Sequence, residues 1–102
     1  MKSYKLENHK YANMEIIEND LSHKEIGKYK TYNLISYTTA ILTVVPNSKM
    51  VVLGNSLYSM TTRKHVSWFI DWAHKMGILP KEITYKDIKK AIEDSHLDIL
   101  YY

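Results

Sequence analysis

The chain has 102 residues and no cysteine, so it forms one domain without disulfide bonds and cannot use thiolate catalysis. Its Lys and Arg residues number fourteen against eleven Asp and Glu residues, and the resulting net charge of +3 is too small to indicate nucleic-acid binding by itself. No apolar run approaches the roughly 18 residues of a membrane span, and the start lacks the apolar core of a signal peptide. We therefore expect a protein of the cytoplasm.

The first third of the chain, residues 1–31, is polar and has no decisive periodicity. Met14 and Ile17 recur at helical spacing, whereas Met14 and Ile16 alternate as they would in a strand, so the pattern supports both structures. We favour a strand or irregular element near residues 11–18 and a loop to about residue 30.

Residues 32–45 are dense in β-branched and aromatic side chains and contain neither Gly nor Pro, which predicts one long strand. Residues 46–49 begin with a proline and supply a turn, and residues 50–53 resume the strand pattern. The pattern predicts an antiparallel hairpin over residues 32–53. On its first strand, alternation predicts that one face is buried, formed by Ala40, Leu42 and Val44.

Two helices are predicted after this hairpin. Apolar side chains share one face of residues 62–76, and Gly77 is placed to end this helix in a left-handed conformation. Thr84 and Asp87 have the spacing of a capping box at the start of a second helix over residues 84–93.

The tail after the second helix alternates polar and apolar residues, which is compatible with an edge strand. The elements together predict a single α+β domain over residues 1–102, in which an antiparallel sheet built on the 32–53 hairpin carries both helices on one face.

The junction before the first helix places small hydroxyl side chains next to cations. We expect Thr61 and Thr62 to cap the helix, and an alternative is that they bind a phosphate or sulfate with the free N–H groups there. Arg63 and Lys64 stand where the helix dipole disfavours positive charge. A bound anion, an acidic partner or plain solvent exposure would each account for these two cations.

Other candidate residues allow both a structural and a functional interpretation. We interpret His65 as a partly buried packing residue beside Trp72, because no second ligand accompanies it at metal-binding spacing. Trp68 either closes the core or anchors a partner. A lysine-rich face of the second helix either follows a phosphate backbone or is simply solvated, and it comprises Lys86, Lys89 and Lys90.

No paired carboxylates, catalytic Ser-His-Asp motif or nucleotide-binding loop is present in the sequence. We therefore expect a protein that is not an enzyme and that uses neither a cofactor nor a metal.

One part of the sequence is similar to proteins already known. The run Ser36-Tyr37-Thr38-Thr39-Ala40-Ile41-Leu42, and after a hairpin the run Tyr58-Ser59-Met60-Thr61-Thr62-Arg63-Lys64-His65, resemble a group of small uncharacterised proteins of bacteriophages and plasmids. Their shared pattern is similar to Ser-Tyr-x-Thr-x-Ile-Ala, then a hairpin, then Tyr-Ser-x-Thr-Thr-x-Lys-His opening a helix. Here Thr38 stands where an acidic residue is usual, and Leu42 replaces a small residue.

This resemblance implies the setting of an accessory gene on a mobile element, where small proteins often bind and redirect host machinery. We therefore expect a non-catalytic protein that binds a host protein or ribonucleoprotein complex, and inhibition of an antiviral defence complex, as by anti-CRISPR proteins, is one form of such binding. The alternative is a small nucleic-acid-binding protein that uses its lysine-rich helix faces. The candidate binding residues are Thr61, Thr62, Arg63, Lys64, His65, Trp68, Lys86, Lys89 and Lys90.

Overall fold

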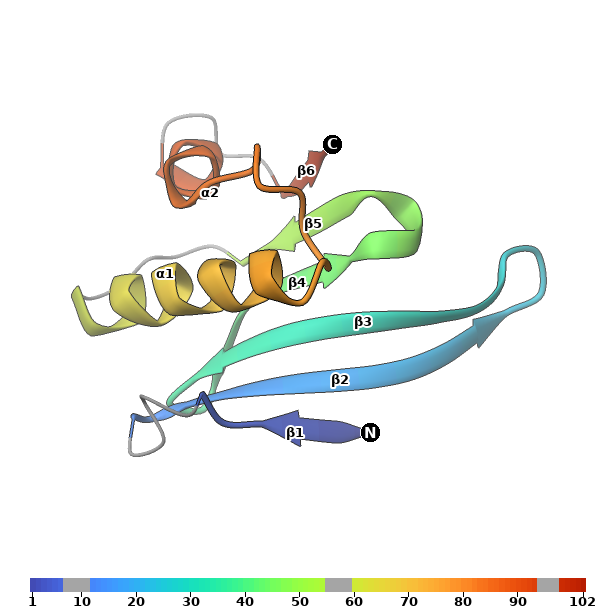
Figure 1. Ribbon diagram of the computed structural model, residues 1–102, viewed down its shortest axis with the longest axis horizontal. Helices are drawn as coiled ribbons and strands as arrows, with labels where there is room; N and C mark the ends of the chain where they lie inside the picture. Colours follow the sequence, from blue (N-terminus) through green and yellow to red (C-terminus); the bar gives the residue numbers. More distant parts are fainter. Residues whose placement is uncertain (7–11, 55–59, 94–97) are drawn as a thin grey trace.

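The computed structural model describes residues 1–6, 12–54, 60–93 and 98–102. Six strands form one antiparallel sheet in the order β1-β2-β3-β4-β5-β6, and the two helices lie between β5 and β6 along the chain (Figure 1). The elements are β1 (Lys2–Tyr4), β2 (Met14–His23), β3 (Gly27–Ser36), β4 (Thr39–Val45), the 3-10 turn η2 (Pro46–Ser48), β5 (Met50–Leu53), α1 (Met60–Lys75), α2 (Tyr85–Glu93) and β6 (Ile99–Tyr101). The expected α+β class, with both helices on one face of an antiparallel sheet, is confirmed.

The core lies between the helices and the face of the sheet that they cover. Alternate residues of the strands point into it, and each helix contributes a stripe of buried side chains at three- and four-residue spacing. Burial of this apolar surface is the main force that holds the helices on the sheet. The buried core includes Met14, Ile16, Leu34, Leu42, Val44, Val51, Leu53, Val66, Phe69, Ile70, Ala73, Ile88, Ala91 and Ile92.

The end of α1 and the start of α2 are those that the sequence predicted. Gly77 has a φ of 71°, and the N–H of Ile78 donates to the carbonyl of Ala73 at 2.9 Å, which closes α1 as a Schellman motif does. The N–H and the hydroxyl of Thr84 donate to Oδ2 of Asp87 at 2.8 and 3.0 Å, so these residues form the predicted cap of α2. Neither helix is long and apolar enough to cross a membrane, in the parts of the chain that the structure describes.

The predicted single strand over residues 32–45 is wrong, because the chain turns between β3 and β4. Tyr37 adopts a φ of 57° in this turn, a conformation that non-glycine residues seldom take. Since the turn contains neither Gly nor Pro, its sequence resembles that of a continuous strand. The hairpin of β4 and β5 around residues 46–49 is confirmed.

A β-bulge explains why one expected core residue is exposed. Leu34 pairs with Leu42 while Ile35 pairs with Ala40, which leaves Ile41 as an extra residue in β4. Ile41 and Leu42 are therefore both buried, whereas Ala40 is exposed. The predicted burial is confirmed for Leu42 and Val44 and is wrong for Ala40.

The expected loop up to residue 30 is also wrong, because β2 and β3 form a long hairpin there. They pair without interruption from Met14 and Ser36 to His23 and Gly27, and Gly27 has a φ of 77° at the turn. Residues 19–31 extend beyond the paired parts of β1 and β4 and form an arm of two strands (Figure 1). Polar side chains on both faces of this arm hide the alternation that marks a half-buried strand.

The C-terminal tail forms an edge strand, as the alternation of polar and apolar residues in it allowed. β6 pairs with β5 through Val52 with Ile99, Val51 with Leu100, and Met50 with Tyr101. This pairing returns the chain to the sheet after both helices have crossed it (Figure 1).

Candidate functional site

The two runs that carry the sequence resemblance meet in space at the start of α1. Oγ of Ser36, at the end of β3, lies 2.8 Å from Nδ1 of His65 and 3.3 Å from Oγ1 of Thr62. All three side chains are buried, with exposed fractions of 2% for Ser36, 4% for Thr62 and 1% for His65. We call these residues the motif cluster. Buried polar groups that bond to one another in this way fix the position of the helix start against the strand.

The contact between Ser36 and His65 has the atoms of a nucleophile and a base, but its surroundings favour a structural role. A catalytic serine must reach a substrate, and the side chain of Ser36 is enclosed between β3 and α1. The geometry of the described residues therefore supports the motif cluster as a link between two elements.

Tyr37 follows Ser36 in the chain and lies at the surface beside the motif cluster. Its N–H donates to the carbonyl of Asn13 at 2.7 Å, and its ring centroid lies 5.9 Å from that of His65. The ring is nevertheless exposed, and the backbone is in the left-handed region. Such strain persists only where the surroundings hold it, and it is concentrated at functional sites in proteins.

The interpretation of His65 needs correction in two respects. Its ring contacts Trp68, at a centroid distance of 5.6 Å, and not the expected Trp72, and it is buried fully instead of partly. Trp72 packs against Tyr4 and Phe69, on another part of the core. Trp68 itself is half-buried and packs on the core while remaining partly open to solvent.

The predicted cap at Thr61 and Thr62 is wrong, because α1 begins at Met60 and both threonines lie in its first turn. Thr61 is exposed and Thr62 belongs to the motif cluster. Tyr58 and Ser59 of the quoted pattern fall outside the described residues.

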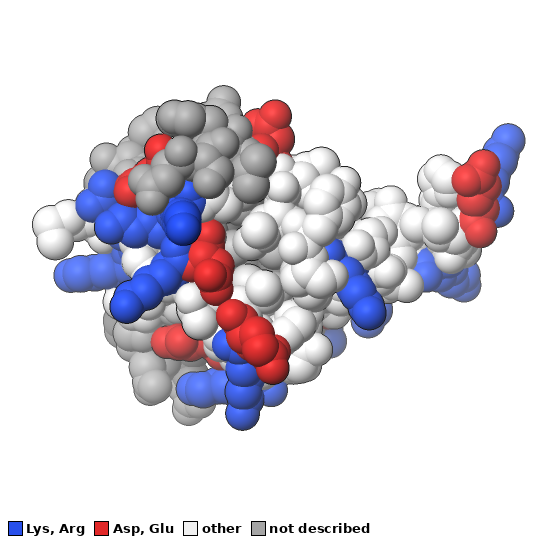
Figure 2. Space-filling view, turned by 90° about the horizontal axis from the view of Figure 1, so that it is seen from above, with Lys and Arg blue, Asp and Glu red and all other residues white. Residues whose placement is uncertain are grey.

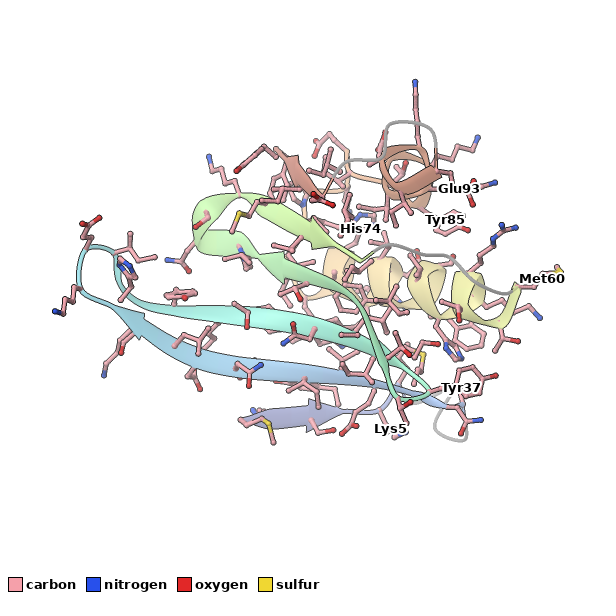
Figure 3. The ribbon with its side chains drawn as sticks, turned by 180° about the vertical axis from the view of Figure 1, so that it is seen from behind. Lys5, Tyr37, Met60, His74, Tyr85 and Glu93 are labelled. Carbon is pink, nitrogen blue, oxygen red and sulfur yellow. The ribbon has the colours of Figure 1, made fainter. Side chains whose placement is uncertain are left out.

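A shallow groove of about 240 Å³ runs between the two helices near the start of α1. It is lined by Met60, Arg63, Lys64, Ser67 and Tyr85, and we call it the helix groove. Met60 is 75% exposed at its end. Figure 3 shows Met60 and Tyr85 on different helices at the end of the molecule where Tyr37 also lies.

The charge of Arg63 has a partner within the chain. Its Nη2 lies 3.2 Å from Oε1 of Glu93 and joins α1 to α2 at the surface. This ion pair explains the position of Arg63, for which the sequence offered a bound anion, an acidic partner or solvent exposure. Lys64, one residue further, makes no ion pair with the part of the chain that the structure describes.

The lysines of α2 divide between two sides of that helix. Tyr85, Lys89 and Glu93 recur every four residues, so Lys89 lies on the side that faces the helix groove. Lys86 and Lys90 are exposed on the neighbouring side. Figure 2 shows basic side chains gathered where the helices lie, with acidic side chains among them.

The structure thus separates the nine candidate binding residues into two groups. Thr62, His65 and Trp68 face inward. The outward group borders the helix groove or the outer side of the helices, and it comprises Thr61, Arg63, Lys64, Lys86, Lys89 and Lys90. The sequence analysis missed Ser36 and Tyr37 as site residues, although both stand in the quoted motif.

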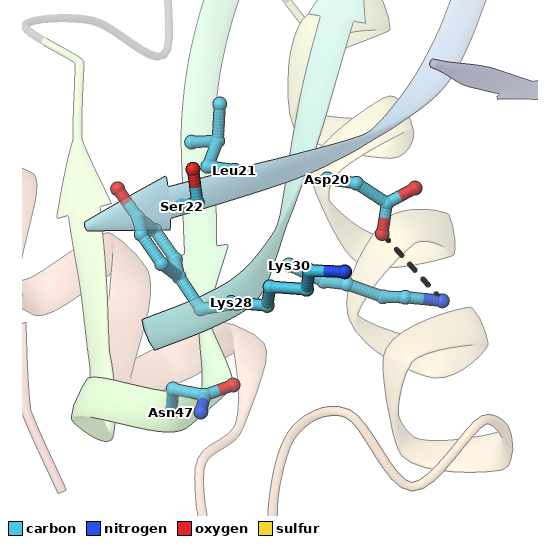
Figure 4. A pocket seen from close by; sticks show the side chains of 7 residues that line it. Asp20, Leu21, Ser22, Lys28, Lys30 and Asn47 are labelled. Atoms are coloured by element: carbon cyan, nitrogen blue, oxygen red, sulfur yellow. Dashed lines mark ion pairs between the residues drawn. The ribbon is translucent and has the colours of Figure 1, made fainter. Parts of the chain in front are cut away.

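A second hollow, of about 650 Å³, lies against the β2–β3 arm and is drawn in Figure 4. Nζ of Lys30 lies 3.9 Å from Asp20 and 3.6 Å from Glu18. Burial raises the pKa of Glu18, but the hydrogen bond from Tyr4 and the charge of Lys30 outweigh it and hold that pKa below its usual value. Charges beside this hollow therefore pair largely with one another.

Comparison with known proteins gives a family without an assigned activity. A family of unknown function, DUF8033, matches residues 3–88. No curated protein and no solved structure matches the chain. In the described parts of the chain, no three His, Asp or Glu side chains lie together as metal ligands would.

Proposed function

The chain belongs to the DUF8033 family, and we propose that it is a non-catalytic protein that binds an acidic surface of another protein through the helix groove. The observation that carries this proposal is the groove itself, in which the exposed Met60 and the half-buried Tyr85 stand beside Lys64, a cation that makes no ion pair with the described residues. The strained and exposed Tyr37 lies at the same end of the molecule, on the other side of α1 from Tyr85 (Figure 3).

The residues of the groove resemble the centre and rim of a protein interface. Met and Tyr are enriched at such interfaces, where a Met side chain adapts to its partner and a Tyr ring provides apolar area with a polar tip. Met60 and Tyr85 supply these two types here. Lys64 lines the groove, and Lys89 lies one turn of α2 beyond Tyr85, so both would attract carboxylates of the partner.

The charge arrangement favours a protein over a nucleic acid as the partner. Arg63 is the one arginine of the chain, and its guanidinium is engaged by Glu93 instead of being free to fork a phosphate or a base. Asp87 and Glu93 stand among the lysines of α2 and would repel a phosphate backbone. A protein surface with both signs of charge fits this face better.

The resemblance of residues 36–65 to small phage and plasmid proteins supports a more specific form of the proposal. In that form the protein acts in the cytoplasm of a host cell, and its partner is a host protein or ribonucleoprotein complex. Inhibition of an antiviral defence complex is then its role.

The test is capture of partners from a bacterial lysate by the tagged protein, followed by affinity measurement with the purified partner. The variant Lys64→Glu with Lys89→Glu reverses two charges at the groove and leaves the Arg63–Glu93 pair intact. We expect at least about a tenfold loss of affinity. The matched control, Lys24→Glu with Lys28→Glu, makes the same charge change on the β2–β3 arm and should keep wild-type affinity.

Two results would contradict the proposal. Wild-type affinity in the groove variant would exclude the helix groove as the binding surface. Capture that disappears after nuclease treatment, with binding of the purified protein to nucleic acid, would establish the nucleic-acid alternative.

A further inference from the structure

One edge of the β2–β3 arm is open along β3. β4 pairs with residues 32–36 of β3 and ends at Val45, because Pro46 begins the turn η2. Residues 27–31 of β3 therefore have no strand partner on the side of η2, in the parts of the chain that the structure describes. We call this stretch the arm edge. The backbone N–H and C=O groups of such an edge are a template for another strand.

The hollow of about 650 Å³ lies beside the arm edge (Figure 4). Residues 28–30 line it from β3, and Asn47 lines it from η2. If β4 continued in its register, residues 46–48 would stand opposite residues 28–30, but they turn away as η2. The arm edge is about 17 Å long at the usual rise of a strand, which is the length of a common strand. The hollow is therefore placed to receive one extended segment.

The arm has little core of its own. Its cross-strand pair of Leu21 and Tyr29 shares one face, where Leu21 is 43% exposed and Tyr29 is half-buried. A ribbon of two strands is marginally stable in water, whereas three strands with an apolar face are stable. An added strand would therefore supply both ladder hydrogen bonds and cover for this pair.

The arm edge carries positive charge that is only partly balanced. Lys28 and Lys30 lie two residues apart on β3, so they share one face of the strand. Lys30 pairs with Asp20 and Glu18, whereas Lys28 makes no ion pair with the described residues. The turn of the arm, residues 24–26, contains one Lys and one Glu and adds no net charge. A carboxylate on an added strand would complement Lys28.

We propose that the arm edge binds an extended segment of another protein, in which acidic and apolar residues alternate, and that this segment becomes an added strand beside β3. Its acidic side chains stand on the face of Lys28 and Lys30, where opposite charges on neighbouring strands attract. Its apolar side chains stand on the other face, beside Tyr29.

Charge disfavours a second copy of the chain as the occupant. A two-fold antiparallel contact between two arm edges is centred on one residue near the middle of the edge. Centring on Tyr29 places Lys28 opposite Lys30 of the second copy, and centring on either lysine places it opposite itself. Like charges directly opposite each other on neighbouring strands are destabilising.

The arm edge is separate from the helix groove. Met60 of the groove lies at one end of the molecule and the arm projects at the other (Figures 1 and 3). Binding at one of these surfaces therefore does not require binding at the other.

The test is titration with two synthetic peptides, monitored by the backbone amide signals in NMR spectra. One peptide is acetyl-Val-Glu-Val-Glu-Val-Glu-Val-amide, and the other has Lys in place of each Glu. We expect the acidic peptide to shift the signals of residues 27–31 and to bind at least about tenfold more tightly than the basic peptide. Proline in place of the third residue of the acidic peptide removes a ladder donor and should weaken binding several-fold.

The variant Lys28→Glu tests the charge of the arm edge itself. It should reverse the preference, so that the basic peptide binds more tightly than the acidic one. Lys64→Glu is the matched control, because it makes the same charge change at the helix groove, and it should keep the wild-type preference at residues 27–31. Circular dichroism melting verifies that both variants are folded.

Several outcomes would overturn the proposal. One is the absence of shifts at residues 27–31 with about 2 mM acidic peptide. Shifts confined to α1 and α2 would place acidic binding at the helix groove instead, and equal affinities for the two peptides would remove the basis for an acidic segment. Self-association in ultracentrifugation that Lys28→Glu alters would assign the arm edge to a second copy. Failure of the groove variant in partner binding leaves the peptide results unaffected.

Discussion

At the scale of single residues, the motif cluster connects sequence similarity to a physical role. Ser36 is small enough to be enclosed and polar enough to bond both Thr62 and His65. An apolar residue of the same size would leave these buried groups with one partner fewer. The ring of His65 packs beside the ring of Tyr37, so the buried motif cluster also positions a residue that is exposed at the surface.

The first prediction is that Ser36→Ala destabilises the protein. Loss of the hydroxyl removes one hydrogen-bonding contact from each of two buried polar side chains, and the expected decrease in the free energy of unfolding is about 1–3 kcal/mol. Urea denaturation followed by circular dichroism measures it. Ser22→Ala, on the exposed arm, is the matched control and should change stability by less than about 0.5 kcal/mol. Equal effects of the two changes would show that the cluster has no special role.

The second prediction concerns the strained turn. Asn tolerates the left-handed region better than an aromatic residue does, so Tyr37→Asn should leave the free energy of unfolding within about 0.5 kcal/mol of wild type or raise it. Partner affinity should fall, because the exposed ring is lost. Thermal melting and the capture assay separate these effects. A large loss of stability with unchanged binding would make Tyr37 a structural residue only.

At the scale of elements, the sequence predicted what is encoded locally. Both helices, their ends at Gly77 and Thr84, and the turn after β4 have short-range signals in caps and turn residues. The β2–β3 arm and the turn at Tyr37 were missed, since the arm lacks an alternating pattern and the turn contains no residue that marks one. Such elements are determined by hydrogen bonding between strand residues that are far apart in the chain.

The candidate site shows the same division between local and long-range information. Thr62 and His65 were predicted as site residues because they belong to the helix-start motif. Their bonds to Ser36, and that of Arg63 to Glu93, join residues far apart in the chain and could not be derived from spacing. The predicted neighbour of His65 was wrong for this reason, because Trp68 and Trp72 are both within one or two helical turns of it.

The third prediction tests the cap of α2 through its pH dependence. The N–H and the hydroxyl of Thr84 bond the carboxylate of Asp87 and hold its pKa below the ordinary value of 3.8. A lowered pKa means that the charged form stabilises the folded state above pH 4, and that this contribution disappears as the pH falls through the pKa of the folded state.

Asp87→Asn should therefore lower the melting temperature by a few degrees near neutral pH, and the difference from wild type should shrink as the solution is acidified through that range. Melting curves at a series of pH values measure this. Asp71→Asn, on the exposed side of α1, should show neither the loss nor its pH dependence. A difference that stays constant down to about pH 2 would contradict a role for the charge.

At the scale of the whole molecule, the two sides differ in their charge. Lysines and acidic residues gather around the helices (Figure 2), whereas the strand row through Asn33, Thr43 and Val52 on the opposite face of the sheet has no charged residue. The helix side is therefore the one suited to an oppositely charged partner. Because salt screens contacts between charged groups, its effect on partner binding tests this assignment.

The last prediction is that salt weakens the binding of the partner to the helix groove. Raising the salt concentration from about 0.05 M to about 0.5 M should weaken partner binding several-fold. The shorter Debye length at high salt screens the attraction between the lysines at the groove and the carboxylates of the partner. Titration calorimetry with the purified partner at a series of salt concentrations measures the effect. Affinity that stays unchanged across this range would show that the groove lysines do not contribute to binding.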